Sequence, residues 1–262
     1  MSQIGQVAMD VRIPPEHFDI LGNQVRVLSR DEAIHTLQEA VTKRQFTRIS
    51  FLNAHNANLA CANNTFRQTL ERFTILADGI GVDLAARILY GQPFPANLNG
   101  TDFVPALLAD TQSPLRIGLI GTTEERSAAA AVNLETRFPR HEIVFRHHGF
   151  FSKAEESELL SDLADARPDV LLVGMGVPRQ EFWIAEKLNP SHCTLAFGIG
   201  ALIDFLSEDI PRAPSWVRRL RLEWLYRLVL EPKRLWRRYI LGNPLFLLRV
   251  LRQKFSRRAG AA

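Results

Sequence analysis

The sequence predicts an α/β protein in which helices cover both faces of a mostly parallel sheet, followed by a basic helical appendage. From residue 47 to residue 198, short apolar segments alternate with longer segments of helical periodicity. The apolar segments are nearly continuous rather than alternating, which is typical of parallel strands buried on both faces. The last 52 residues carry 14 basic residues and only two acidic ones.

The N-terminal third predicts a leader, a hairpin and the first strands. Residues 1–17 are polar, contain proline and lack periodicity, which predicts a flexible leader. A hairpin is expected over 18–28, because Gly22-Asn23 is a turn signal. Ser29 is expected to cap a helix over 30–43, with Glu32 in its first turn. The elements expected next are a strand at 47–52, a helix at 57–72, a strand at 73–77 and helices at 82–90 and 102–111.

The remainder predicts four more strands and a helical tail. The expected elements are a strand at 115–120, a helix at 124–138, a strand at 142–146, a helix at 153–166, a strand at 170–173, a helix at 179–188 and a strand at 194–197. Tail helices are expected at about 214–230, 232–241 and 245–255, with a break at Asn243-Pro244. We therefore expect a leader (1–17), a core (18–210) and an appendage (211–262).

The candidate site lies where these strands end. In parallel sheets ligands bind beyond the carboxyl ends of the strands, and glycine there lets a ligand approach the backbone. The residues that follow the strands are Asn53, Asp78-Gly79, Gly121-Thr122, Gly174-Met175-Gly176 and Gly198-Ile199-Gly200.

Each of these residues also has a purely structural interpretation. Asp78 is either a general base or nucleotide contact, or a turn-forming residue. Asn53 either binds a substrate hydroxyl or caps a helix. The segment 174–181 opens a helix and is either a phosphate site or a tight turn. His55, His147 and His148 form no cluster at metal spacing, so the residues give no positive argument for a metal.

The tail differs from the rest of the chain in charge. It carries +12, while the whole chain carries +4, so residues 1–210 carry −8. Three of the four tryptophans also lie in the tail. Cations interleaved with Trp and Leu suit a membrane interface, although charge alone also allows nucleic-acid binding. Two cysteines exclude a disulfide framework, and no segment of about 18 uncharged apolar residues is present.

Several motifs, taken in order, resemble one family. They are Asn53-Ala54, the ADGIG segment 77–81, Gly100-Thr101-Asp102, the G-x-G-x-P-x-Q-E segment 174–181, the FGIGA segment 197–201 with Asp204, the RAP-x-W segment 212–216, the LEWLYR segment 222–227 and the EP-x-R segment 231–234. In this order they resemble the WecG/TagA/CpsF glycosyltransferases, glycosyltransferase family 26. The resemblance covers residues 18 to 243 and implies a Rossmann-like fold.

The resemblance also implies an activity. Members transfer a sugar, here of glucose or N-acetylmannosamine type, from a UDP-sugar to an undecaprenyl-diphosphate-linked saccharide. The transfer inverts the anomeric carbon, uses no metal and no cofactor, and takes place at the cytoplasmic face of the inner membrane during exopolysaccharide and other cell-surface polysaccharide synthesis. The implied partners are the UDP-sugar, the lipid acceptor and an anionic membrane to which the protein binds peripherally. No nucleic acid is expected, and association with further copies of the chain is left open.

Site roles follow from the same resemblance. Asp78 is expected to be the general base and Asn53 to place a substrate sugar. The residues expected at the donor are Gly121, Thr122, Gly174, Gly176, Pro178, Gln180, Gly198, Gly200 and Asp204. The residues expected at the acceptor or a diphosphate are Thr101, Asp102, Arg212, Arg219, Arg221, Arg227 and Arg234. The tail is thereby expected to complete the site over the strand ends, with arginine in place of a metal.

One departure and two rival functions accompany these expectations. Many relatives have Arg shortly before the Gly of the G-x-D block, whereas Asn97-Leu98-Asn99 precedes Gly100 here, which puts a phosphate contact from that loop in doubt. A nucleic-acid-binding protein is the first rival. A nicotinamide-dependent oxidoreductase is the second, and it is disfavoured because a third glycine is missing and Gly198 stands where an acid would bind the ribose.

Overall fold

The computed structural model describes residues 16–208, 212–214, 217 and 222–259. Its strands are β1 (His17–Ile20), β2 (Asn23–Arg26), β3 (Thr47–Leu52), β4 (Thr74–Ala77), β5 (Arg116–Gly121), β6 (Glu142–His147), β7 (Val170–Gly174) and β8 (Leu195–Gly198). The helices of the core are α1 (Arg30–Thr42), α2 (Ala54–Ala62), α3 (Asn64–Leu70), α4 (Ile80–Tyr90), α5 (Gly100–Asp110), α6 (Glu124–Arg137), α7 (Lys153–Ala166), α8 (Arg179–Lys187) and α9 (Leu202–Leu206). The tail contains α11 (Glu223–Leu230), α12 (Pro232–Trp236), the π-helix η1 (Arg237–Leu241) and α13 (Gly242–Ala259).

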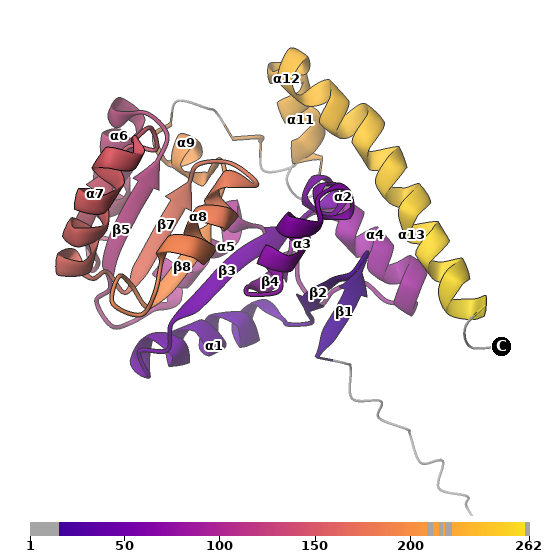
Figure 1. Ribbon diagram of the computed structural model, residues 1–262, viewed down its shortest axis with the longest axis horizontal. Coiled ribbons are helices and arrows are strands. Elements are labelled where there is room, and N and C mark those ends of the chain that lie inside the picture. Colours follow the sequence, from indigo (N-terminus) through magenta and orange to yellow (C-terminus); the bar gives the residue numbers. More distant parts are fainter. Residues whose placement is uncertain (1–15, 209–211, 215–216, 218–221, 260–262) are drawn as a thin grey trace, which may run out of the picture.

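The eight strands form one sheet in the order β1-β2-β4-β3-β8-β7-β5-β6. Only β1 and β2 pair antiparallel, and every other pair is parallel, which confirms the predicted mostly parallel sheet. The early strands lie on one side of the β3–β8 pair and the later strands on the other (Figure 1). The order therefore reverses next to β3 and β8, and in open α/β sheets a ligand crevice forms at such a point.

Apolar cores lie on both faces of the sheet, as predicted. Helices α1, α5, α6 and α9 bury side chains on one face, and α2, α3, α4, α7, α8 and α13 on the other. Strand β7 supplies both cores, because Leu171 and Val173 belong to one and Val170 and Leu172 to the other. Alternate residues of a strand point to opposite faces, so a continuous apolar run is what a doubly covered strand requires.

Two local predictions need correction in the core. The single helix expected over 57–72 is two helices, because Asn63 adopts an extended backbone and its side chain accepts a hydrogen bond from the Phe66 amide, which starts α3. Helix α9 was not predicted at all, since its five residues are too few to show a period. The predicted cap at Ser29 is confirmed: Ser29 and Glu32 bond reciprocally as a capping box.

The predicted break at Asn243-Pro244 is wrong, because the chain runs through it as one helical segment into α13. The π-helix η1 precedes it, and the Gly242 amide bonds back to the carbonyl of Arg237. The regular α-helical hydrogen bonding is therefore already interrupted just before Pro244. Because proline has no amide to donate, Pro244 is accommodated there, in the first turn of α13.

The tail packs along one end of the core, where α13 runs beside α2 and α4 (Figure 1). Phe246 and Val250 are buried against these helices. Arg249 donates to Asn58 Oδ1 at 2.8 Å, and Arg257 forms an ion pair with Asp19 at 2.9 Å. Part of the positive charge of the tail therefore attaches it to the acidic core rather than to an external partner.

Some predictions lie outside the described residues. They are the leader up to residue 15, Arg219, Arg221 and the start of the first tail helix. The hairpin begins at His17, the last residue assigned to the leader. Among the helices that the structure describes, none is long and apolar enough to cross a membrane.

Candidate active site

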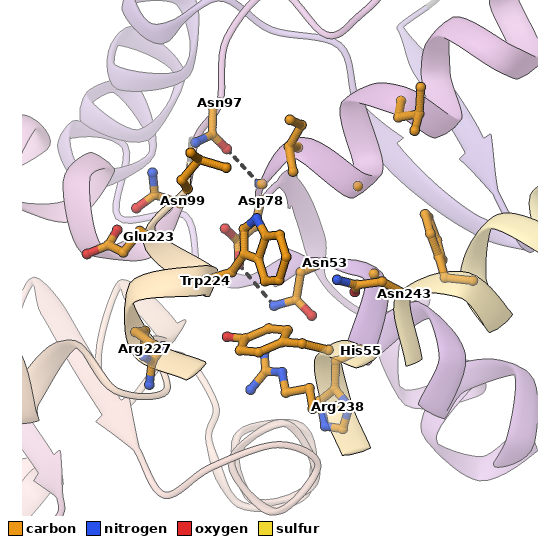
Figure 2. Close-up of a pocket in the computed structure, with 18 of the residues that line it drawn as sticks. Asn53, His55, Asp78, Asn97, Asn99, Glu223, Trp224, Arg227, Arg238 and Asn243 are labelled. Carbon is orange, nitrogen blue, oxygen red and sulfur yellow. Dashed lines mark hydrogen bonds between the residues drawn. The ribbon is translucent and has the colours of Figure 1, made fainter. Parts of the chain in front are cut away.

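A cavity of about 390 Å³ opens at the carboxyl ends of β3 and β4. One wall comes from α2, α4 and the segment before α5, and the other from α9, α11, η1 and α13 (Figure 2). The appendage therefore encloses this cavity together with the core.

Asp78 and Asn53 lie next to each other in the middle of this cavity (Figure 2). Asn53 Nδ2 donates to Asp78 Oδ2 at 3.0 Å, and Asn53 Oδ1 accepts from the Asn56 amide at 3.1 Å. The second bond caps α2, so the helix-capping role considered for Asn53 is confirmed, and its amide also contacts Asp78. The hydrogen bond from the Asn56 amide fixes the side chain of Asn53, and that side chain in turn fixes the carboxylate of Asp78.

The surroundings of Asp78 favour its protonated form. Burial raises the pKa of Asp78 above its ordinary value, and the nearby Glu223 carboxylate adds to this, while the hydrogen bond from Asn53 and the charges of Arg238 and Arg227 oppose it. A carboxylate with a raised pKa is a stronger proton acceptor once ionised. Position and pKa both suit a general base.

Two arginines of the tail reach the same cavity, Arg227 from α11 and Arg238 from η1. Their Nε atoms are buried and have no hydrogen-bond partner among the described residues. The Arg227 guanidinium lies 5.3 Å from the centre of the Phe205 ring. A buried cationic donor without a partner is costly unless an anion binds it, and guanidinium matches the oxygens of a phosphate. This part of the cavity suits a diphosphate.

The π-helix brings an aromatic side chain to the cavity beside Arg238. Tyr239 follows Arg238 in η1, and its ring packs edge-to-face on Trp224 with the centres 5.6 Å apart. Both rings line the cavity. π-helical turns are rare and often occur at functional sites.

His55 also lines the cavity and lies beside Arg238 (Figure 2). Burial and the charge of Arg238 lower the pKa of His55 to about 4. The imidazole is therefore neutral at pH 7 and can exchange hydrogen bonds with an uncharged group such as a hydroxyl. From the sequence, this histidine was considered as a metal ligand, and it formed no cluster at metal spacing.

The other described residues predicted to bind the acceptor or a diphosphate lie partly in the cavity lining and partly outside it. Thr101 and Asp102 line the cavity. Arg212 forms ion pairs with Asp102 at 2.9 Å and with Glu223 at 3.4 Å, so it joins two walls of the cavity. Arg234 pairs with Glu231 at 2.6 Å on the surface and is not among the lining residues.

Asn97, which stands where relatives were expected to carry arginine, has a local partner. Its Oδ1 accepts from the Gly79 amide at 2.7 Å. This bond occupies a free amide at the start of α4, directly after Asp78, and the backbone there is held without an arginine. Asn99, two residues later, caps α5 by accepting from the Asp102 amide at 3.0 Å.

The residues predicted to bind the donor form a second group along the same edge of the sheet. They lie at or after the carboxyl ends of β5, β7 and β8, beside the cavity rather than in its lining. Asp204 Oδ1 accepts from Thr122 Oγ1 at 2.8 Å and faces Arg126 at 3.4 Å. Because the next residue, Phe205, lines the cavity, α9 connects the two groups.

Glycines allow close backbone packing in this second group. A methyl group at Gly121 would collide with the carbonyl of Gly174. Gly176 and Gly200 have φ of 80° and 56°, which glycine adopts without strain. Pro178 lies at the N-terminus of α8, after a cis peptide bond. The strand ends thus present backbone to whatever binds above them.

Gln180 lies beneath this group instead of facing it. The side chain is buried; its Oε1 accepts from the Gly200 amide at 3.1 Å, and its Nε2 donates to Glu181 at 2.9 Å. Ser50 of β3 also donates to Glu181, at 3.0 Å. This network ties β3, α8 and the turn after β8 together, so Gln180 holds the Gly198–Gly200 turn through its backbone.

Glu181→Gln is expected to change how stability depends on pH. Burial raises the pKa of Glu181 from 4.5 to about 7. Between these values the folded protein keeps a proton that the unfolded chain has lost, so folding stability falls as pH rises through this window and is lowest above it. The variant should remove this loss, so that its free energy of unfolding falls by about 3 kcal/mol less between pH 4 and pH 8 than that of the unsubstituted protein. Denaturant unfolding at both values measures it, and Glu186→Gln, on the exposed side of α8, is the control. An equal pH dependence in all three proteins would contradict the assignment.

Among the cavity residues that were not predicted are His55, Glu223, Trp224, Arg238 and Tyr239. Glu223 and Trp224 lie inside the LEWLYR segment, where proximity to Arg227 was an available signal. Arg238 lies four residues after Arg234, which was predicted. Spacing alone would have placed both on one helical face, but the π-helix separates them.

Comparison with known proteins identifies a family and relatives to which this chain is similar. The model of the family "Glycosyl transferase WecG/TagA/CpsF family" matches residues 18–260. A relative from Bacillus spizizenii (strain ATCC 23059 / NRRL B-14472 / W23) is 33% identical over 182 residues, covering 69% of this chain and 68% of the relative. A second, from Staphylococcus aureus (strain NCTC 8325 / PS 47), is 29% identical over 204 residues, covering 77% and 78%. Both are named N-acetylglucosaminyldiphosphoundecaprenol N-acetyl-beta-D-mannosaminyltransferase.

Proposed function

Because the chain belongs to the WecG/TagA/CpsF family and is a glycosyltransferase, we propose that it transfers N-acetylmannosamine from UDP to an undecaprenyl-diphosphate-linked N-acetylglucosamine. Of the two sugars expected from the sequence, glucose and N-acetylmannosamine, the names of the relatives favour the second. The observation that carries the proposal is Asp78, held by Asn53 in a cavity that the cationic tail closes.

Asp78 acts as the general base. It takes the proton of the acceptor hydroxyl while the hydroxyl oxygen attacks the anomeric carbon from the side opposite UDP. The new carbon–oxygen bond forms as the bond to the UDP oxygen breaks, so configuration inverts and UDP leaves with the bonding electrons. The raised pKa of Asp78 makes it a suitable acceptor for that proton.

Arg227 and Arg238 stabilise the departing diphosphate. Negative charge grows on the leaving oxygen, and cations fixed in a buried site stabilise it without reorganising. Both arginines stand within the electrostatic reach of Asp78, as their effect on its pKa indicates. We propose that they supply the positive charge that a metal ion would otherwise provide.

The donor binds over β5, β7 and β8. The glycine turns at Gly121, Gly174, Gly176, Gly198 and Gly200 present backbone to the nucleotide, and the Thr122–Asp204–Arg126 group supplies polar contacts. In this proposal UDP lies beside α9 and its sugar points toward Asp78. The binding of the nucleotide at glycine-rich strand ends follows the general rule for such sheets.

The tail binds the cytoplasmic face of the inner membrane peripherally, as part of cell-surface polymer assembly. It exposes large apolar side chains at Leu225, Val229, Leu230, Trp236, Ile240, Leu241, Leu245, Leu248, Leu251 and Phe255. Exposed cations at Lys233, Arg234 and Arg252 lie among them. Apolar and cationic side chains on one surface favour an anionic bilayer, where the lipid acceptor is found.

A donor screen tests the proposal. The purified chain is incubated with undecaprenyl-diphosphate-linked N-acetylglucosamine in detergent and, separately, with the UDP derivatives of N-acetylmannosamine, N-acetylglucosamine, glucose and galactose, and products are read by mass spectrometry. Addition of one sugar with UDP-N-acetylmannosamine alone is expected. Transfer from another donor only would correct the sugar, and no transfer from any donor would refute the function.

A further inference from the structure

We propose that the cleft between α4 and α13 binds the first isoprene units of the acceptor lipid, an inference that rests on the proposed function. This cleft is the apolar end of the cavity that holds Asp78. Ile80 and Leu84 of α4 line it on one side, and Phe246 and Leu247 of α13 on the other.

The two residues of α4 are exposed in a way that folding does not explain. Ile80 and Leu84 lie one helical turn apart and are 45% and 40% exposed, whereas Val82, Ala85 and Ala86 of the same helix are buried. Leaving two large aliphatic side chains in water at the mouth of a cavity is unfavourable. An apolar ligand in the cleft would remove both from water.

The cavity has opposite chemistry at its two ends. Arg227 and Asn243 lie on opposite sides of Asn53 and Asp78 in Figure 2. The arginine side adjoins Phe205 and α9, next to the group assigned to the donor. The α13 side carries the apolar residues of the cleft. With the donor at the cationic end and the acceptor hydroxyl at Asp78, the acceptor must enter from the apolar end.

The cleft is continuous with the surface assigned to the membrane. Leu247 lines the cleft, and its neighbours Leu245 and Leu248 on the same helix are exposed by 41% and 46%. A lipid lying in the bilayer can therefore extend along α13 into the cleft without its hydrocarbon crossing water. A polyprenyl chain has this length and chemistry, and a soluble sugar acceptor would not need such a cleft.

The test compares acceptors that differ only in the lipid. The double variant Ile80→Gln/Leu84→Gln and the unsubstituted enzyme are assayed in detergent with N-acetylglucosaminyl diphosphate carrying either an undecaprenyl chain or an ethyl group. The ratio of kcat/KM for the long acceptor to that for the short one should fall roughly tenfold in the variant, through a higher KM for the long acceptor. The apolar variant Ile80→Met/Leu84→Met should keep the original ratio.

The controls separate the possible failures. Val132→Gln removes an exposed aliphatic side chain from α6, far from the cleft, and should leave the ratio unchanged. An unchanged ratio in the double glutamine variant, or an equal loss with both acceptors, would overturn the assignment of the cleft. Absence of transfer by the unsubstituted enzyme to either acceptor would overturn the proposed function, and this inference with it.

Discussion

Asp78→Asn is expected to lower turnover by roughly 10²–10⁴, the usual effect of losing a general base. The amide keeps the size of the carboxylate, and its oxygen can still accept the hydrogen bond from Asn53. Only the ability to take a proton is lost. The KM for the donor should change little, because the cationic and glycine-rich groups proposed to hold UDP are untouched. Steady-state kinetics with the lipid acceptor measures both quantities.

The fold provides the control for this variant. Because the pKa of Asp78 is raised in the folded protein, ionising it costs stability as pH rises through that pKa. Asparagine carries no such cost, so the variant should melt at the same temperature as the unsubstituted protein at pH 8, or higher. A normal Tm with normal turnover would remove Asp78 from the role of base. A lowered Tm would mean that the loss of turnover reports on the fold.

Much of this site could be predicted because it follows strands directly. Asn53 and Asp78 come immediately after two apolar segments, and neighbouring parallel strands necessarily bring their carboxyl ends together. The same reasoning located the glycine turns of β5, β7 and β8. Local sequence order was sufficient there, because a strand and the residue after it are covalently connected.

The tail could not be predicted in this way, because its contacts are distant in sequence. Arg212 was counted as available to a diphosphate, but it pairs with Asp102 on α5. Arg238 was missed because its direction depends on a π-turn and on the packing of α13 against α2 and α4. For Arg234 a local signal did exist, since its partner Glu231 lies three residues earlier.

The apparent excess of charge in the tail is also explained by packing. Arg249 and Arg257 attach α13 to the core, where Asn58 and Asp19 receive them. The net charges of −8 and +12 are therefore partly complementary within one molecule. Among the other cations that the structure describes, Arg227 and Arg238 line the cavity, whereas Lys233 and Arg252 lie on the outer surface of the tail.

Arg238→Gln is expected to lower kcat by roughly 10²–10³, the effect of removing one preorganised donor from a developing negative charge. It should also move the acidic limb of the pH–rate profile to higher pH. Arg238 lowers the pKa of Asp78 by its charge, so its removal lets that pKa rise further, and the base becomes protonated at a higher pH. A variant that merely disturbed packing would reduce kcat without moving the limb.

Arg237→Gln is the matched control for this second variant. It removes the same charge from the same π-helix, but Arg237 is exposed and stacks on Trp236, outside the cavity lining. With detergent-solubilised acceptor it should keep kcat within about threefold, since distant surface charges are screened by salt. If both variants lost activity equally, net charge of the tail would be the cause. If only Arg238→Gln lost it and the limb moved, one guanidinium beside Asp78 both sets the strength of the base and stabilises the leaving group.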